Sequence, residues 1–332
     1  MMKQRPYLIA EIGGNHQGDR KRLERLTSLA IDSGADCIKF QLYSGDTLVN
    51  KNIDQTRNLH FRKFELNLEV YDKMFEKVMD AGLDCTASFW SFEFYERYKG
   101  FIPFIKIGSG DLTNYPLIKQ FTKTSKPIIL STGLSSYDEV SQAVKYIRNQ
   151  NSFYNTQSNL TVLQCTSMYP IPPNEANLSV MNEFKKLNVK VGYSDHTIGE
   201  EALYIAGIMG ASVLEFHFTD DKQDASFRDH LVSLEKDDVQ NLVLRFDNAL
   251  EMIGSNLKIP TPSETEAGHV QSFRRGIYCS KPISKGEIIS MDKLTFLRPD
   301  LGSNSTIHYD RLINTEAKRD YDYLDPIAVD ER

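Results

Sequence analysis

Residues 189–217 have the sequence VKVGYSDHTIGEEALYIAGIMGASVLEFH. Two mainly apolar runs, 189–194 and 212–218, bracket a segment with helical periodicity, which is the pattern of a strand, a helix and a second strand. A histidine lies at the end of each run, His196 after the first and His217 in the second. Strands buried on both faces of a parallel sheet should be almost wholly apolar. Polar residues at their ends therefore indicate a site.

The same unit recurs from residue 6 to residue 253. We predict eight strands, at 6–12, 37–43, 84–89, 104–109, 127–133, 160–166, 189–194 and 212–218. Segments with helical periodicity alternate with them, at 20–33, 68–81, 91–99, 114–123, 137–149, 176–187, 199–209 and 235–253. Alternation with short connections favours a parallel sheet, and eight units favour its closure. The predicted fold class is α/β, a (β/α)8 TIM barrel with its site at the C-terminal ends of the strands.

The composition changes after the predicted barrel, which spans 1–254. Residues 255–272 are rich in Pro, Ser, Thr and Gly and are predicted to form a linker. Residues 273–332 contain short β-like pieces at 276–279 and 294–297, which indicate a small β-rich domain. A domain of about 60 residues has a marginal core of its own. We expect this domain to pack against its own barrel or against that of a neighbouring subunit.

Charge and hydropathy exclude several classes of protein. The 332 residues include 39 Lys and Arg against 45 Asp and Glu, a net charge of -6, which does not suit a nucleic-acid partner. No apolar run approaches the roughly 18 residues that span a bilayer, and the first residues lack a secretory signal. Four scattered cysteines without a CxxC pair fit reduced thiols. We expect a cytoplasmic protein with no membrane association.

Two histidines end consecutive predicted strands, His196 on the seventh and His217 on the eighth. Their side chains could converge at the mouth of the barrel. Imidazoles with nearby carboxylates suit a divalent transition metal. The alternative is that each is a hydrogen-bonded histidine of the core.

Two lysines, Lys39 and Lys106, end the second and fourth predicted strands. An unpaired buried ammonium group costs several kcal/mol, so each lysine pairs with a carboxylate or awaits an anionic ligand. Serine hydroxyls at neighbouring strand ends could complete a cradle for phosphate and carboxylate groups; they are Ser109, Ser131 and Ser194. A Schiff-base lysine is the competing catalytic use.

Further charged residues lie in predicted loops. Asp111 and Asp229 could orient sugar hydroxyls or transfer protons, although carboxylates at such positions are more often solvated. Arg298 lies in the small domain, where a surface charge is the default interpretation.

Six segments of the predicted barrel carry distinctive sequences: AEIGGNHQGD at 10–19, GAD at 34–36 continuing to IKFQ at 38–41, KIGSGDLTN at 106–114, LSTG at 130–133, QCTSMYP at 164–170 and GYSDHT at 192–197. Their order and spacing resemble the sialic acid synthase (N-acetylneuraminate synthase) family, and the resemblance covers nearly the whole chain. After the barrel, RR at 274–275, ISKGE at 283–287 and LRP at 297–299 resemble that family's C-terminal antifreeze-like (SAF) domain.

The resemblance implies a condensation of phosphoenolpyruvate with an N-acylated amino sugar. The expected acceptor is N-acetylmannosamine or a 2,4-diacetamido-6-deoxy hexose, and the products are a nonulosonic acid and phosphate, released by C–O cleavage. A divalent metal (Mn, Mg or Co) is implied as cofactor. A domain-swapped homodimer is the implied working unit, with Arg298 reaching into the partner subunit's barrel.

The family's functional residues can be matched to positions of this sequence. The metal-binding positions match His196 and His217. The phosphoenolpyruvate-binding positions match Lys39, Lys106, Ser109, Ser131 and Ser194. The sugar-binding positions match Gln41, Thr86, Tyr169, Asp229 and Arg298. The catalytic positions match Glu11, Asp111 and Asp229, with Glu11 as the group that handles the proton of the attacking water.

The sequence departs from the family on the sugar side. Phe216 stands where the family commonly has a basic residue, and SFRDH at 226–230 replaces its PGPDH stretch. These departures leave the acceptor open. Two other functions are alternatives: a different phosphoenolpyruvate-dependent 2-keto-3-deoxy sugar acid synthase, whose phosphorylated sugars would need extra basic residues, and a non-catalytic sugar-binding relative, which would lack metal ligands or lysines.

Overall fold

The computed structural model describes residues 4–329. The chain divides into two compact units, Met1–Gly254 and Ser255–Arg332. Within the described residues, no helix combines the length and the apolar character needed to cross a bilayer.

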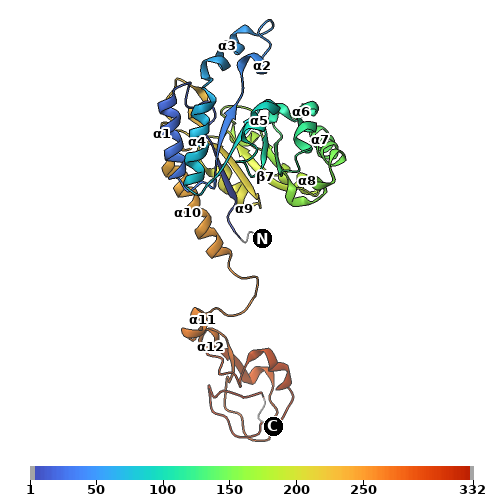
Figure 1. The fold of residues 1–332 in the computed structure, drawn as a ribbon. Helices are drawn as coiled ribbons and strands as arrows, with labels where there is room; N and C mark the ends of the chain where they lie inside the picture. Colours follow the sequence, from blue (N-terminus) through green and yellow to red (C-terminus); the bar gives the residue numbers. More distant parts are fainter. Residues whose placement is uncertain (1–3, 330–332) are drawn as a thin grey trace. The chain divides into compact units, whose positions relative to one another are not determined.

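The first unit is a closed barrel of eight parallel strands in sequence order, with β8 paired to β1 (Figure 1). This confirms the predicted (β/α)8 fold. The strands are β1 (Tyr7–Glu11), β2 (Cys37–Leu42), β3 (Asp84–Phe89), β4 (Ile105–Ile107), β5 (Ile128–Ser131), β6 (Leu160–Cys165), β7 (Lys190–Asp195) and β8 (Val213–His217). Seven match their predicted ranges closely, and β4 is three residues long because the chain turns into a 3-10 helix at Ser109–Asp111.

Seven of the eight predicted helices are found close to their expected ranges around the barrel (Figure 1). They are α1 (Arg20–Ile31), α4 (Leu68–Asp80), α5 (Phe92–Tyr98), α6 (Tyr115–Thr122), α7 (Tyr137–Gln150), α9 (Glu201–Ile208) and α10 (Lys236–Ile253). Apolar stripes hold them on the sheet, as in α4, where Tyr71, Met74 and Val78 are buried. The Asp19 side chain accepts hydrogen bonds from two backbone N–H groups and starts α1 there.

The eighth predicted helix, 176–187, is shorter than expected. Helix α8 spans only Val180–Lys185. A 3-10 turn at Pro173–Glu175 comes first, and Asn177 has a left-handed φ of 49°. A residue in that conformation cannot belong to a right-handed helix, so the start of α8 is displaced past it.

Two helices follow β2 that the sequence analysis did not predict, α2 (Gly45–Leu48) and α3 (Gln55–Phe64). They project beyond the end of the barrel (Figure 1). Only Asn58 and Phe64 of α3 are buried, so this segment has no apolar stripe from which periodicity could be inferred. The Asn58 amide donates hydrogen bonds to the carbonyl oxygens of Gly45 at 2.8 Å and Val49 at 3.2 Å, which ties the two helices together.

Inside the barrel, side chains from alternate positions form layers. The lower layer is an apolar cluster of residues from six strands or the residues just before them: Ile9, Cys37, Phe104, Ile129, Leu163 and Val213. Side chains of a strand point the same way every second residue. Two positions further along lie Glu11, Lys39, Lys106, Ser131, Cys165 and Glu215. Because the side chains of a strand repeat every two residues, an almost wholly polar layer lies directly above this apolar layer.

The second unit has a small core of its own around Ile277, Ile283 and Leu294. Strands β9 (Gly276–Cys279) and β10 (Leu294–Leu297) pair antiparallel and coincide with the two predicted β-like pieces. The segment predicted as a linker contains two short helices, α11 (Pro262–Glu266) and α12 (His269–Ser272). A capping box between Thr261 and Glu264 starts α11 within a composition that otherwise indicates loops.

Candidate active site

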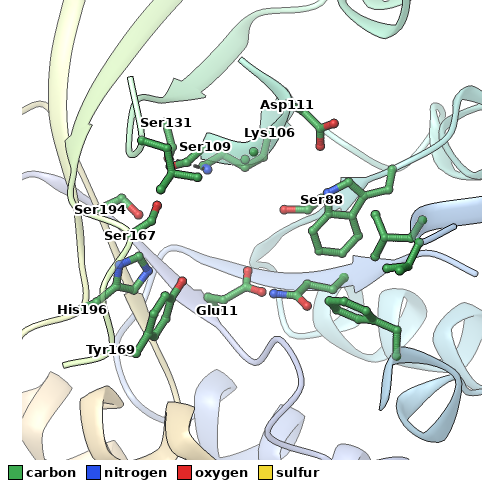
Figure 2. A pocket seen from close by; sticks show the side chains of 18 of the residues that line it. Glu11, Ser88, Lys106, Ser109, Asp111, Ser131, Ser167, Tyr169, Ser194 and His196 are labelled. Carbon is green, nitrogen blue, oxygen red and sulfur yellow. Dashed lines mark hydrogen bonds between the residues drawn. The ribbon is translucent and has the colours of Figure 1, made fainter. Parts of the chain in front are cut away.

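A cavity of about 630 Å³ opens at the C-terminal ends of the barrel strands (Figure 2). It is lined by most of the predicted site residues: Glu11, Lys39, Gln41, Lys106, Ser109, Asp111, Ser131, Tyr169, Ser194, His196 and His217. These side chains come from all parts of the barrel chain, and the layered interior brings them together.

The two lysines share two carboxylates. Lys39 pairs with Glu11 and lies 3.8 Å from a Glu215 oxygen, while Lys106 lies 3.2 Å from the other Glu215 oxygen. All four side chains are almost completely buried. The alternative that each lysine pairs with a carboxylate is therefore correct for this structure. Because both lysines also line the cavity, the pairing does not remove them from the reach of an anion.

Hydroxyl groups surround this network. Lys106 Nζ donates to Ser131 Oγ at 2.7 Å, and Lys39 Nζ donates to Ser88 Oγ at 3.1 Å. Ser194 Oγ donates to Glu215 Oε1 at 3.0 Å. The lysines and hydroxyls therefore form one hydrogen-bonded floor of donors to the cavity, and Glu11 and Glu215 balance the charge of the two lysines. Ammonium and hydroxyl donors of this kind are suited to an anion.

The Ser109 side chain is oriented by a hydrogen bond from the backbone. Its hydroxyl accepts a hydrogen bond from the N–H of Gly133 at 3.0 Å. A Cβ atom at residue 133 would come within 2.9 Å of Ser109 Oγ and 2.2 Å of Ser167 Oγ, so the close approach requires glycine there.

The two carboxyls of the floor titrate in opposite directions. Burial raises the pKa of Glu11, although its partner Lys39 opposes the change. Burial also acts to raise the pKa of Glu215, but Lys106 and Lys39 outweigh it and leave that pKa below its usual range. Two carboxyls whose environments separate their pKa values are suited to different roles, one as a proton carrier and one as a fixed charge.

The two predicted metal ligands face each other. The ring centroids of His196 and His217 are 5.2 Å apart, and the Tyr169 ring packs on His196 at 4.0 Å. Burial lowers the pKa of both imidazoles, so both are neutral at pH 7. His196 Nδ1 donates to the Thr166 carbonyl oxygen at 2.8 Å, which leaves Nε2 with a free lone pair. His217 Nδ1 is buried and has no hydrogen-bond partner among residues 4–329.

These features fit a divalent cation. Neutral imidazoles are the form that binds metals, and a second ring nitrogen bonded to a carbonyl fixes the ligand orientation. Within the described residues, no group of three His, Cys, Asp or Glu side chains is arranged to hold a metal. A cation held by His196 and His217 would therefore take its other ligands from substrate or water.

Two predicted site residues of the barrel do not line the cavity. Thr86 is fully buried one layer below Ser88, and its hydroxyl donates to the Phe104 carbonyl oxygen at 3.1 Å. Side chains two apart on a strand occupy different layers, so Ser88 and not Thr86 lines the cavity in this structure. The role of Thr86 in sugar binding stays a prediction. Asp229 is buried outside the cavity lining, with Oδ2 at 4.0 Å from His217 Nδ1.

Arg298 belongs to the second unit. Its guanidinium group lies over the Phe273 ring, 5.2 Å from the centroid. The prediction that it reaches into a partner's barrel stays a prediction.

Sequence analysis did not predict the residues at the outer end of the cavity. This end is lined from α2, α3 and the loops after β2, β3 and β5, by Leu48, Val49, Asn50, Ile53, Asp54, Arg57, Phe61, Trp90 and Leu134. Trp90 directly follows the predicted third strand, so its position at a strand end could have identified it as a site residue. The α2–α3 segment has no sequence pattern that predicts a role in the cavity.

Fold and cavity define the class of protein: a TIM-barrel protein with its polar site at the C-terminal ends of the strands, where enzymes of this fold keep their active sites. The model of the NeuB family matches residues 26–258, and the chain belongs to that family. The resemblance to sialic acid synthases is thereby confirmed.

Named relatives span several sugar acids. The chain is 34% identical to the N,N'-diacetyllegionaminic acid synthase of Legionella pneumophila, over 89% of this chain and 86% of the relative. It is 32% identical to the human N-acetylneuraminate-9-phosphate synthase, over 87% of this chain and 82% of the relative. The crystal structure of an N-acetylneuraminic acid synthetase from Leptospira borgpetersenii in complex with citrate superposes with a TM-score of 0.72 at 26% identity, covering 81% of this chain and 92% of that one.

Proposed function

We propose that this protein condenses phosphoenolpyruvate with an N-acylated amino sugar to give a nonulosonic acid and phosphate. The observation that carries the proposal is the floor of the cavity, where two buried lysines and several hydroxyls lie beside two neutral histidines. The names of the relatives, which are synthases of such acids, support the same reaction class.

The lysine floor would bind the anionic substrate. Lys39 and Lys106 supply charge, and Ser109, Ser131 and Ser194 supply hydroxyls to the phosphate and carboxylate of phosphoenolpyruvate. Both lysines already face a carboxylate, Glu215. The bound anion would take over part of these ion pairs. Holding both substrates in attack geometry converts their encounter into an effectively unimolecular step.

The reaction forms one carbon–carbon bond and breaks one C–O bond. C3 of the enol attacks the aldehyde carbon of the open-chain sugar, whose oxygen takes up a proton. Water adds at C2 of the former enol, and phosphate leaves with cleavage of its bond to C2. A divalent cation held by His196 and His217 would supply polarisation of the aldehyde.

Glu11 is positioned to accept the proton of the attacking water. Its carboxyl lines the cavity, pairs with Lys39 and has a raised pKa because it is buried. A base with a pKa nearer to neutral pH transfers protons more efficiently than an ordinary carboxylate. Gln41, Tyr169 and Asp111 would contact the sugar from the walls.

A second subunit completes the proposed enzyme. The second unit would act as the family's antifreeze-like domain and would carry Arg298 into the partner subunit's barrel, as in a domain-swapped dimer. The small core of the second unit is consistent with a domain that works against a larger neighbour.

An assay of phosphate release tests the proposal. The purified chain is incubated with Mn²⁺, phosphoenolpyruvate and each of several N-acylated amino sugars, and we expect stoichiometric phosphate and a 2-keto acid product with at least one of them. The product's C2–O bond should carry oxygen from ¹⁸O-labelled water. Phosphoenolpyruvate that neither binds nor reacts with any acceptor would contradict the proposal.

A further inference from the structure

Arg228 is an exposed arginine whose side chain is held at two points. Its side chain is 68% exposed, but its Nε donates to Asp229 Oδ1 at 3.1 Å, and its guanidinium group lies over the Tyr169 ring, 4.6 Å from the centroid. Fixing a long side chain costs conformational entropy, which such contacts must offset. Arg228 belongs to the stretch SFRDH, where this sequence departs from the family, so the family pattern does not account for these contacts.

The two partners of Arg228 each adjoin a histidine of the site. The Tyr169 ring packs on His196 with its centroid 4.0 Å from that of the imidazole (Figure 2), and it meets His217 edge-on at 5.7 Å. Asp229 Oδ2 lies 4.0 Å from His217 Nδ1. Arg228 itself is outside the cavity lining. It is therefore one side chain away from both imidazoles.

The segment that carries the arginine is anchored to the barrel. Residues Arg228–Val232 form a 3-10 helix, and Ser233 Oγ donates to the backbone carbonyl oxygen of Asp229 at 2.6 Å. The Phe227 ring packs against Phe64 of α3 with centroids 5.1 Å apart. Because the Asp229 carboxyl is buried, it gives the arginine a fixed partner. The fold itself therefore sets where the guanidinium group lies.

The Tyr169 ring transmits this position to His196. A guanidinium group is attracted to the face of an aromatic ring, so the contact holds the ring where the arginine is anchored. The same ring packs on the imidazole at 4.0 Å. The contacts form a chain of four side chains from Asp229 through Arg228 and Tyr169 to His196.

We propose that Arg228 is a positioning residue for the condensation: anchored on Asp229, it holds the Tyr169 ring against His196 and so fixes the imidazole that would bind the cation. This inference rests on the proposed function and adds a residue to its machinery. Groups around a ligand imidazole keep it in its binding orientation, and losing one lowers metal affinity by about tenfold or more. Arg228 acts through Tyr169 and not by contact with a substrate.

Charge alone predicts the opposite effect. A guanidinium group close to a bound cation repels it, so its removal would strengthen cation binding. The Asp229 carboxylate would also lose its partner and would attract the cation more strongly. Loss of positioning weakens cation binding instead. The direction of the change in the dissociation constant therefore distinguishes the two roles of Arg228.

The dissociation constant of Mn²⁺, measured from the electron paramagnetic resonance signal of free Mn²⁺, tests the inference. Arg97→Ala is the matched control, because Arg97 lies over the Tyr98 ring at 6.0 Å, pairs with Asp72 and is outside the cavity lining. We expect Arg228→Ala to raise the dissociation constant about tenfold and Arg97→Ala to leave it unchanged. Phosphoenolpyruvate affinity in metal-free buffer should stay the same in both variants, because the lysine floor is intact. An unchanged or lower dissociation constant in Arg228→Ala would overturn the inference and leave the proposed function intact.

A second background tests whether Arg228 acts through Tyr169. In Tyr169→Leu, the further change Arg228→Ala should alter the Mn²⁺ dissociation constant by less than about twofold, because the ring that it positions is gone. An equal loss of affinity in both backgrounds would overturn the inference. A wild-type protein that binds no Mn²⁺ would overturn the metal site of the proposed function, and the inference with it.

Discussion

Glu215 on β8 and Lys106 on β4 form an ion pair at 3.2 Å inside the barrel. The two strands are separated by three others in either direction around the closed sheet, so the pair joins opposite walls. With Lys39 and Glu11, it makes the floor of the cavity a neutral network of two cations and two anions.

Replacing Lys106 by methionine tests the anion site. The variant removes one cation and leaves Glu215 with only the more distant Lys39, so we expect phosphoenolpyruvate affinity to fall about a hundredfold. Breaking a buried pair should also lower the free energy of unfolding by about 3 kcal/mol. Calorimetric titration and urea denaturation measure the two effects. Lys186→Met, at a lysine whose side chain is 66% exposed, is the control, and an unaltered affinity in Lys106→Met would refute the assignment.

Removing the His217 imidazole tests the proposed metal site. We expect His217→Ala to lose Mn²⁺ binding in equilibrium dialysis and to lose condensation, while circular dichroism shows a folded barrel. His308→Ala, in the second unit, should retain both properties. Full turnover of the wild-type protein in metal-free buffer would show that the reaction needs no cation and that the histidines have another role.

Complementation between two inactive variants tests the swapped dimer. Arg298→Ala has an intact barrel, and Lys106→Met has an intact Arg298, so a mixed dimer contains one complete site if Arg298 acts on the partner. Random reassortment should then restore about a quarter of wild-type activity. Activity is measured after the subunits are dissociated and mixed. Absence of any rescue in verified mixed dimers would place Arg298 elsewhere.

The buried imidazole of His16 makes stability depend on pH. Its Nδ1 accepts a hydrogen bond from the Gly18 N–H at 3.1 Å, its Nε2 lies 3.3 Å from the Tyr71 hydroxyl, and burial lowers its pKa to about 4. The unfolded chain takes up this proton near pH 6.5, so the stabilisation is complete above that pH and is lost as pH falls toward 4. The loss amounts to about 3 kcal/mol.

Urea denaturation between pH 7 and pH 4.5 measures this effect. His16→Asn retains an acceptor for the Gly18 N–H but cannot titrate. We expect the slope of its unfolding free energy against pH to be smaller than that of the wild type, by an amount that corresponds to nearly one bound proton. Parallel curves for the two proteins would exclude His16 as the source.

The barrel could be predicted because its strands are buried on both faces. Each strand therefore shows in the sequence as a short apolar run, and the runs alternate with amphipathic stripes such as that of α4. The α2–α3 excursion could not be predicted in this way. The buried residues of its two helices are Gly45, Asn58 and Phe64, and a helix without an apolar stripe has no periodic signal.

Residues of the site could be predicted where they end a buried strand, and could not be predicted where their depth in the barrel decides their role. His196, His217, Lys39 and Lys106 were found because a polar residue at the end of a buried run is costly without a use. The sequence could not distinguish Thr86 from Ser88, because two polar residues two positions apart on β3 occupy different depths, and only the closed barrel shows that Ser88 reaches the cavity.

By itself, the sequence determined the eight-strand barrel, the polar strand ends and the family, because burial on both faces and the strand period of two are local properties of the chain. Only the tertiary structure decided that Glu11 and Glu215 together neutralise the two lysines and that Trp90, Phe61 and Ile53 line the same cavity. Those relationships join strands and helices far apart in sequence, and closure of the sheet, which no local pattern encodes, sets which side chains meet.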